Sequence, residues 1–320
     1  MLESTIESDY EEIISIELDN DELVRLVTSN ADVASQYVVF QNSHDEYFAI
    51  NVAKVEELIE YKTLTITETT DKTGIIKGTS KIREHFVSIV CFDAWLGIEC
   101  ADKSSYELAI ICNYAGIRLA IIVKSVYGVL NIEPSEMYND VDKDKKIAYL
   151  CEIPIHSNKL LCKVFDSDQF LADVVPNKFE KELKKTNSLM QEKESKITTE
   201  ILIAEDSILI QDAIKTLLDK MNLNYQVFDD GQELIDALKN KNIDDIGLII
   251  TDLEMPVMGG LELLDICSQS EEYQKIPIIV NTNMSNASII HSAEKLGAKK
   301  VIKKLDLLTL QEVIFEFARY

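Results

Sequence analysis

Short apolar runs of strand length fill the chain from residue 36 to about residue 165. They are rich in β-branched and aromatic residues, as strands usually are. The clearest examples are Tyr37–Phe40, Phe86–Val90, Leu108–Cys112 and Leu119–Val123. We expect a hairpin turn at Asn113–Gly116, and a helix over Val52–Tyr61, whose apolar residues share one face. The pattern predicts a mostly-β domain, arranged as a barrel or as paired small barrels.

From residue 200 onward, strand-like runs alternate with helical patterns. In the helical stretches, apolar residues recur every three or four positions, first from Ile210 to Met221 and last from Leu310 to Phe317. Five strand–helix units within about 120 residues predict an α/β domain with a doubly wound, five-stranded parallel sheet. The strand-like runs are Ile201–Ala204, Tyr225–Phe228, Gly247–Thr251, Pro277–Val280 and Lys300–Lys303.

A polar segment of mixed charge separates the two patterned regions and shows little apolar periodicity. Such a segment is typical of a linker, and Pro176 directly before it is a stop signal for regular structure. The predicted organisation is an acidic N-terminal segment, a mostly-β domain, a linker and a parallel α/β domain. Their predicted bounds are residues 1–34, 35–176, 177–197 and 198–320.

Polar residues end or follow four of the five strand-like runs in the α/β domain. They are Glu205-Asp206 at the first run, Asp252 at the third, Asn281-Thr282-Asn283 at the fourth and Lys303-Lys304 at the fifth. The carboxyl ends of parallel strands share one edge of the sheet, which is where ligands bind. We therefore expect three carboxylates, one hydroxyl and one ammonium to converge at that edge.

Three converging carboxylates repel each other unless a proton or a cation offsets their charge. Hard oxygen ligands in a half-open site suit Mg²⁺, which shares its shell with water and phosphate. Asp252 could then attack phosphorus to form an aspartyl phosphate, with the cation, Thr282 and one of the two lysines neutralising the phosphoryl oxygens. This hypothesis requires that Glu205 and Asp206 lie close to Asp252 and that water can reach Asp252.

The α/β domain resembles the receiver domain of two-component response regulators over about residues 200–320. The matching residues are Glu205-Asp206, the run from Asp252 to Gly260 (Asp-Leu-Glu-Met-Pro-Val-Met-Gly-Gly), Thr282 and Lys304. The resemblance implies a flavodoxin-like fold, a bound Mg²⁺ and phosphorylation of Asp252. By the same resemblance, the metal ligands are Glu205, Asp206, Asp252 and the backbone carbonyl of Glu254, and the phosphoryl group binds Thr282 and Lys304. Lys304 is preferred to Lys303 by its distance from Thr282.

Three positions depart from the receiver pattern. Leu305 stands where proline usually follows the lysine, Val301 where an aromatic switch residue is usual, and Asn283 where a small residue is usual. One alternative is a receiver fold that accepts no phosphate, which we disfavour because competent residues fill the site positions. Another is a magnesium-dependent phosphatase of the haloacid dehalogenase type. That class usually has a second aspartate two residues after the nucleophile, where this chain has Glu254.

The mostly-β domain shows no catalytic constellation, but it carries a short signature made of Lys77-Gly78, Ile82-Arg83, Asp93 and Leu96-Gly97. This signature resembles the CheW-like coupling domain, which joins chemoreceptors to their histidine kinase, over about residues 35–175. The resemblance implies a double barrel and makes Arg83 a partner-contact residue. The alternative is an arginine at a solvated strand end, since Glu84-His85 stand where a glycine normally follows. Phe92 and Trp95 are expected in the core.

A coupling domain followed by a receiver resembles the CheV type of chemotaxis coupling protein. The resemblance implies a non-enzymatic adaptor that couples methyl-accepting chemoreceptors to the chemotaxis histidine kinase and is regulated by phosphorylation of Asp252. The alternative is a phosphate sink that drains the kinase without changing the coupling, and Val301 in place of the aromatic switch favours it. Catalysis would be limited to the receiver's own phosphoryl transfer and slow autodephosphorylation.

Composition disfavours some classes of binding partner and indicates the cellular compartment. The chain has 32 Lys and Arg against 56 Asp and Glu, a net charge of −24, which disfavours nucleic acids and anionic lipid surfaces as partners. We see no secretory signal and no apolar run of the roughly 18–20 residues that span a bilayer. The six cysteines form no CxxC pair and the four histidines have no zinc spacing, so we expect buried free thiols. We predict a cytoplasmic protein, associated with receptor arrays at the membrane and not inserted into it.

Overall fold

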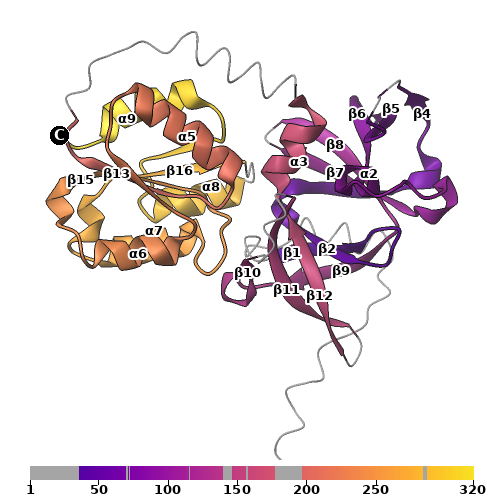
Figure 1. Ribbon diagram of the computed structural model, residues 1–320, viewed down its shortest axis with the longest axis horizontal. Helices are drawn as coiled ribbons and strands as arrows, with labels where there is room; N and C mark the ends of the chain where they lie inside the picture. The colour runs from indigo at the N-terminus through magenta and orange to yellow at the C-terminus, as the bar shows by residue number, and fades with distance from the viewer. Residues whose placement is uncertain are drawn as a thin grey trace, which may run out of the picture.

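The structure is a computed structural model, in which two folded parts of the chain lie side by side (Figure 1). The predicted segment 1–34 and all of the predicted linker except Ile197 lie outside the residues that the structure describes. The described residues are 36–69, 71, 73–114, 116–139, 146–155, 158–176, 197–283 and 287–320.

Two six-stranded sheets form the N-terminal part, which is mostly β as predicted. The first has the strand order β10-β11-β12-β2-β1-β9 and the second β3-β7-β8-β6-β5-β4. The strands are β1 (Gln36–Gln41), β2 (Tyr47–Asn51), β3 (Val55–Glu60), β4 (Ile66–Glu68), β5 (Ile76–Ile82), β6 (His85–Cys91), β7 (Leu108–Tyr114), β8 (Ile117–Val123), β9 (Ser125–Asn131), β10 (Tyr138–Asn139), β11 (Ile147–Ile155) and β12 (Asn158–Phe165). The α-helices and 3₁₀ turns of this part are α2 (Phe92–Leu96), α3 (Ser167–Val174), η2 (Val52–Lys54), η3 (Tyr61–Thr63), η4 (Lys103–Ser105) and η5 (Pro134–Glu136).

Two local predictions for this part have different outcomes. The hairpin turn is confirmed, because β7 and β8 pair antiparallel and the side-chain oxygen of Asn113 accepts a hydrogen bond from the Gly116 N–H at 2.7 Å. The helix over Val52–Tyr61 is wrong, because only Val52–Lys54 form a 3₁₀ turn and Val55–Glu60 form strand β3. β3 pairs antiparallel with β7. Pairing with β7 therefore determines the backbone conformation of these residues, although their apolar spacing is that of a helix.

Aromatic side chains form the centre of the N-terminal core. The ring of Phe92 lies 5.1 Å from Phe40, 4.9 Å from Phe48, 5.5 Å from Trp95 and 5.2 Å from Phe165, centroid to centroid. All five residues are at most 3% exposed. The prediction that Phe92 and Trp95 belong to the core is therefore confirmed, and α2 is fixed by its packing against the strands of the first sheet.

Truncating Phe92 to alanine is expected to lower the free energy of unfolding of this part by about 3–5 kcal/mol, because it leaves a cavity among four other rings. Trp95, the sole tryptophan of the chain, lies beside that cavity and reports unfolding by fluorescence in a urea titration. The matched control is Phe86→Ala, since Phe86 is 77% exposed and its loss should cost about 0.5 kcal/mol or less. Equal costs for the two variants would show that the aromatic cluster is not the packing centre.

The C-terminal part is a five-stranded, all-parallel sheet with helices on both faces, as predicted. The strand order is β14-β13-β15-β16-β17, and α5 and α9 pack on one face while α6, α7 and α8 pack on the other (Figure 1). Its strands are β13 (Glu200–Ala204), β14 (Tyr225–Phe228), β15 (Ile246–Thr251), β16 (Ile278–Thr282) and β17 (Lys300–Lys303). Its α-helices and 3₁₀ turns are α5 (Ile208–Lys220), α6 (Gly231–Leu238), α7 (Gly260–Gln269), α8 (Ala287–Lys295), α9 (Leu307–Phe317), η6 (Ile243–Asp245) and η7 (Tyr273–Lys275).

The central strand β15 is apolar up to its end, so its nearest acidic side chain lies at the edge of the sheet. All six of its residues are buried, because helices cover both faces of the sheet. Its first polar side chain beyond the strand is Asp252, and β13 likewise leads directly into Glu205. Because the strands are parallel, these polar residues meet at the same edge.

Candidate functional site

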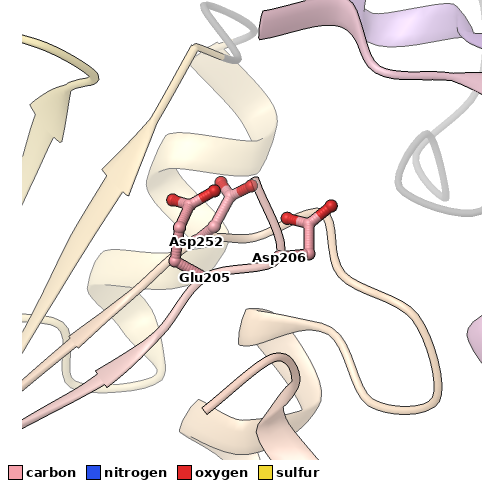
Figure 2. Close-up of side chains that lie close together, drawn as sticks. All are labelled: Glu205, Asp206 and Asp252. Atoms are coloured by element: carbon pink, nitrogen blue, oxygen red, sulfur yellow. The ribbon is translucent and has the colours of Figure 1, made fainter. Parts of the chain in front are cut away.

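Three carboxylates meet where β13 and β15 end (Figure 2). Glu205 and Asp206 follow β13, Asp252 follows β15, and one oxygen of each lies within 4.8 Å of the others. The Asp252 N–H donates to the Ala204 carbonyl at 2.9 Å, which holds the two strand ends together. Among the described residues, this is the group of three or more acidic, histidine or cysteine side chains that could hold a metal ion. The closeness that the phosphorylation hypothesis requires is present.

Lys304 supplies the ammonium of the site. Its Nζ lies 2.8 Å from Oδ2 of Asp252 and 2.8 Å from Oε1 of Glu205, and the residue is buried. Burial disfavours the charged lysine, but the surrounding carboxylates outweigh it and raise the pKa of Lys304 well above its ordinary value. Lys303 is exposed, so the lysine that the sequence favours is the one in the cluster. Leu305, one of the departures from the receiver pattern, follows with a φ of 69°, a strained backbone for a branched residue.

Thr282 and Asn283 lie beside this lysine at the end of β16. Thr282 is the last residue of the strand, and its carbonyl accepts a hydrogen bond from the Lys304 N–H at 3.3 Å. Both Thr282 and Asn283 are buried. The structure thus brings Thr282 and Lys304 to the same edge as the acids.

The donor set fits a magnesium ion. Oε2 of Glu205 is buried and has no hydrogen-bond partner among the described residues, so a carboxylate oxygen is left for a ligand. Burial raises the pKa of Glu205 well above its ordinary value, although Lys304 opposes the shift. Burial also raises the pKa of Asp206 to about 7. A divalent cation held by Glu205, Asp206 and Asp252 would favour the charged carboxylates and offset this cost.

The N-terminal part covers the site. Asp252 is 3% exposed, the Tyr149 hydroxyl of β11 donates to the Asp206 carboxylate, and Lys54 of η2 forms an ion pair with the Glu254 carboxylate. The expectation that water reaches Asp252 is therefore wrong for this arrangement, in which the residue is buried beside the contact between the two parts. The predicted metal role of Glu254 concerns its backbone carbonyl, which this ion pair does not occupy.

The first turn of α3 also faces the site. Asp168 places Oδ2 at 2.8 Å from Nζ of Lys304, and its Oδ1 accepts a hydrogen bond from the side-chain amide of Asn283 at 2.7 Å. Asp166 caps the helix, because its carboxylate accepts the Asp168 N–H at 2.8 Å, and it also lies 3.4 Å from the hydroxyl of Ser207. Reasoning from the sequence missed these contacts, since an Asp-x-Asp pair before a helix indicates no more than a cap.

Arg83 lies away from this site, at the turn between β5 and β6 in the second sheet (Figure 1). Its φ of 53° is left-handed, so Arg83 itself adopts the turn conformation beside the position where the family pattern has glycine. Its guanidinium pairs with Glu57 at 2.7 Å, and its side chain is 76% exposed. An ion pair with so exposed an arginine contributes little stability, although Glu57 is itself half-buried, so it gives Arg83 no strong structural role. The partner-contact role of Arg83 stays a prediction.

Two further observations concern compartment and membrane. All six cysteines are free thiols, as expected, and five of them are buried. None of the helices in the described ranges is long and apolar enough to cross a membrane.

Comparison with known proteins agrees with the fold of both parts. Residues 36–173 match the CheW-like domain, and residues 201–314 match the response regulator receiver domain. The chain is 25% identical over 283 residues to chemotaxis protein CheV2 of Helicobacter pylori, a match that covers 84% of this chain and 89% of the relative. It is 26% identical over 291 residues to CheV1 of the same organism, covering 85% and 89% of the two chains. It is 30% identical over 114 residues to chemotaxis protein CheY-3 of Vibrio cholerae, covering 35% and 85%.

The fold and the site therefore define a two-domain signalling protein, in which a CheW-like domain precedes a response regulator receiver domain. Both domain types are signalling domains, and receiver domains generally use Mg²⁺. The chain belongs to the receiver family through its C-terminal part, and over most of its length it is a homologue of the CheV chemotaxis proteins.

Proposed function

We propose that this protein is a chemotaxis adaptor whose coupling activity is controlled by magnesium-dependent phosphorylation of Asp252. The CheW-like domain would join chemoreceptors to a histidine kinase, and the receiver would accept the phosphoryl group from that kinase. One observation supports regulation above all: the acids and the lysine that would take up the phosphoryl group lie inside the contact between the two domains. A phosphoryl group added there cannot leave the coupling domain unaffected.

The residues of the site have separate tasks in the transfer. A carboxylate oxygen of Asp252 forms a bond to phosphorus while the P–N bond of a phosphohistidine donor breaks, and the electron pair stays on the imidazole nitrogen, which takes up a proton. Lys304 and Thr282 would bind the phosphoryl oxygens, a role supported by the pairing of Lys304 with Asp252 and by the place of Thr282 at the end of the neighbouring strand. Bound Mg²⁺ would supply the remaining charge neutralisation, held by Glu205 and Asp206. Attack of water on the same phosphorus later restores the free Asp252.

The second candidate function is a phosphate sink, in which the receiver drains the kinase without affecting coupling. The absence of an aromatic residue at position 301, where this chain has Val301, favours the sink. The domain contact favours the adaptor, because Lys304 bonds both the acceptor Asp252 and Asp168 of the coupling domain. A change at Asp252 therefore has a direct route to the coupling domain that needs no aromatic switch.

The proposed partners follow from the coupling domain. They are methyl-accepting chemoreceptors and the chemotaxis histidine kinase, with Arg83 at the contact surface, and the protein would work in the cytoplasm beside the receptor arrays. The net charge of −24 is unfavourable for nucleic acid or an anionic membrane surface as a further partner.

The test of phosphorylation is label transfer from a phosphorylated cognate histidine kinase to the full chain. Label should appear on the chain with Mg²⁺ present and should be lost when a chelator removes the metal, since three carboxylates and a phosphoryl group then lack a counter-charge. The control is a chelator reaction to which Mg²⁺ is added back. Label that persists without divalent metal would contradict the assigned metal site.

The test of the adaptor role is kinase activity in receptor–kinase assemblies that contain the chain with and without beryllofluoride, a phosphoryl mimic. The adaptor predicts that the mimic changes coupling, whereas a sink predicts no difference. Arg83→Glu should weaken coupling and leave label transfer unchanged. The matched control is Lys81→Glu, the same charge reversal at an exposed residue of β5, two positions before Arg83. Equal coupling by the two variants would contradict the contact role of Arg83.

A further inference from the structure

The two domains exchange charged side chains across their contact. Asp168 of the coupling domain pairs with Lys304 of the receiver, and Lys54 of the coupling domain pairs with Glu254 of the receiver. Lys54 also donates to the hydroxyl of Ser167 at 2.6 Å, which ties the two coupling-domain charges together at the start of α3. These ion pairs are buried, so they hold only as long as both partners stay in place.

Asp168 occupies the donors that a phosphoryl group would need. Its two oxygens accept from Nζ of Lys304 and from the side-chain amide of Asn283, the residue directly after Thr282. Burial disfavours its charge, yet Lys304 and Lys54 hold the pKa of Asp168 below its ordinary value, so it is present as a carboxylate. Asn283 departs from the small residue of the receiver pattern, and the contact with Asp168 gives that departure a structural role.

We propose that Asp168 is an internal competitor for the phosphoryl-binding donors of the receiver, so that the closed domain contact and phosphorylation of Asp252 exclude each other. This inference rests on the proposed phosphorylation of Asp252. In the closed form, Asp168 holds Lys304 and the contact covers Asp252, which is 3% exposed. In the phosphorylated form, the phosphoryl oxygens take Lys304 and the carboxylate of Asp168 must leave.

Electrostatics makes the exclusion strong. Nζ of Lys304 already lies 2.8 Å from each of three carboxylates, those of Asp168, Glu205 and Asp252. Phosphorylation replaces the single negative charge of the Asp252 carboxylate with about two on the phosphoryl group, and it does so where Asp168 and the phosphoryl oxygens would both need the ammonium of Lys304. Like charges that share one buried counter-charge repel strongly, so the added charge expels the one acid that can move away with its domain.

Opening exposes a defined surface of the coupling domain. It consists of the first turn of α3, the side of β11 that carries Tyr149, and Lys54 in η2. Phosphorylation thus changes which part of the CheW-like domain partners can reach. The signal passes through a rigid-body separation of domains, and the side chain at position 301 plays no part in it.

The test uses the full chain, ³²P-labelled acetyl phosphate with Mg²⁺, and small-angle X-ray scattering of the same samples. Asp168→Asn should accept label at least about tenfold faster than wild type, because a larger fraction of the protein is open. It should also have the larger radius of gyration before any label is added, whereas wild type should expand only after it is phosphorylated or binds beryllofluoride. The matched control is Asp102→Asn, which removes the same charge from an exposed position before η4 and should behave as wild type.

A second variant, Lys54→Met, breaks the other ion pair and keeps the proposal testable if Asp168→Asn does not fold. It should also raise the labelling rate and the radius of gyration. Wild-type rate and wild-type size for a folded Asp168→Asn would overturn the proposal. Faster labelling without expansion would also overturn it, because the lost charge alone would then explain the rate. If neither wild type nor any variant accepts label, the proposed phosphorylation of Asp252 is wrong. If wild type and all variants accept label at the same rate, phosphorylation stands and the competition by Asp168 is wrong.

Discussion

Replacing Asp252 with asparagine is expected to abolish transfer of the phosphoryl group from a phosphorylated histidine kinase. The amide keeps the size of the side chain and can still accept one of the two hydrogen bonds that the carboxylate accepts from Leu253 and Lys304, but its nitrogen and oxygen do not attack phosphorus under these conditions. The measurement is label on the full chain in the presence of Mg²⁺. Label on wild type should be released by hydroxylamine, because an acyl phosphate reacts with that nucleophile.

The matched control for this substitution is Asp244→Asn, which makes the same chemical change at an exposed residue of η6 and should leave labelling intact. Retained label in Asp252→Asn would mean that another residue accepts the phosphoryl group. The assignment of the site would then be lost, while the receiver fold would remain.

Replacing Lys304 with methionine is expected to have two large effects. Phosphotransfer should fall by about 100- to 1000-fold, because the phosphoryl charge that develops in the transition state loses its main side-chain donor. The closed domain contact should also be lost, since Asp168 and Asp252 would face each other without the ammonium that lies 2.8 Å from both. Removing one partner of a buried ion pair commonly costs about 3–5 kcal/mol.

The measurements for Lys304→Met are the initial rate of label transfer and the radius of gyration in solution. Lys303→Met is the matched control, because Lys303 is the exposed neighbour and its loss should change neither quantity. A compact Lys304→Met protein would show that other contacts hold the domains together. A transfer rate equal to that of wild type would remove Lys304 from the phosphoryl site.

The receiver could be predicted from the sequence in detail because its signals are local. A parallel sheet fixes where each strand end lies, so residues far apart in the chain, such as Glu205 and Asp252, can be placed together from strand runs alone. Strand runs alone left Lys303 and Lys304 open, and the resemblance to receiver domains favoured Lys304 by its distance from Thr282. In the coupling domain, apolar spacing misplaced a helix on Val52–Tyr61, because pairing with a partner strand decides the conformation and a single sequence does not show that partner.

The domain contact could not be predicted from the sequence for a different reason. Lys54, Tyr149 and Asp168 carry no signal of their own, because an isolated charge or tyrosine on a coupling domain is indistinguishable from a surface residue. Their importance comes from a second domain whose position depends on tertiary packing. Asn283 was the one sign of the domain contact in the sequence, because it departs from the receiver pattern at the position whose side chain donates a hydrogen bond to Asp168.

The 3% exposure of Asp252 has a consequence for the choice of donor. Small acyl phosphates could react only with the fraction of molecules whose domains have separated, so we expect them to phosphorylate Asp252 slowly. A kinase bound to the CheW-like domain would hold the domains apart, and we therefore expect faster phosphorylation by such a kinase. Phosphorylation would then be concentrated on molecules already assembled with the kinase.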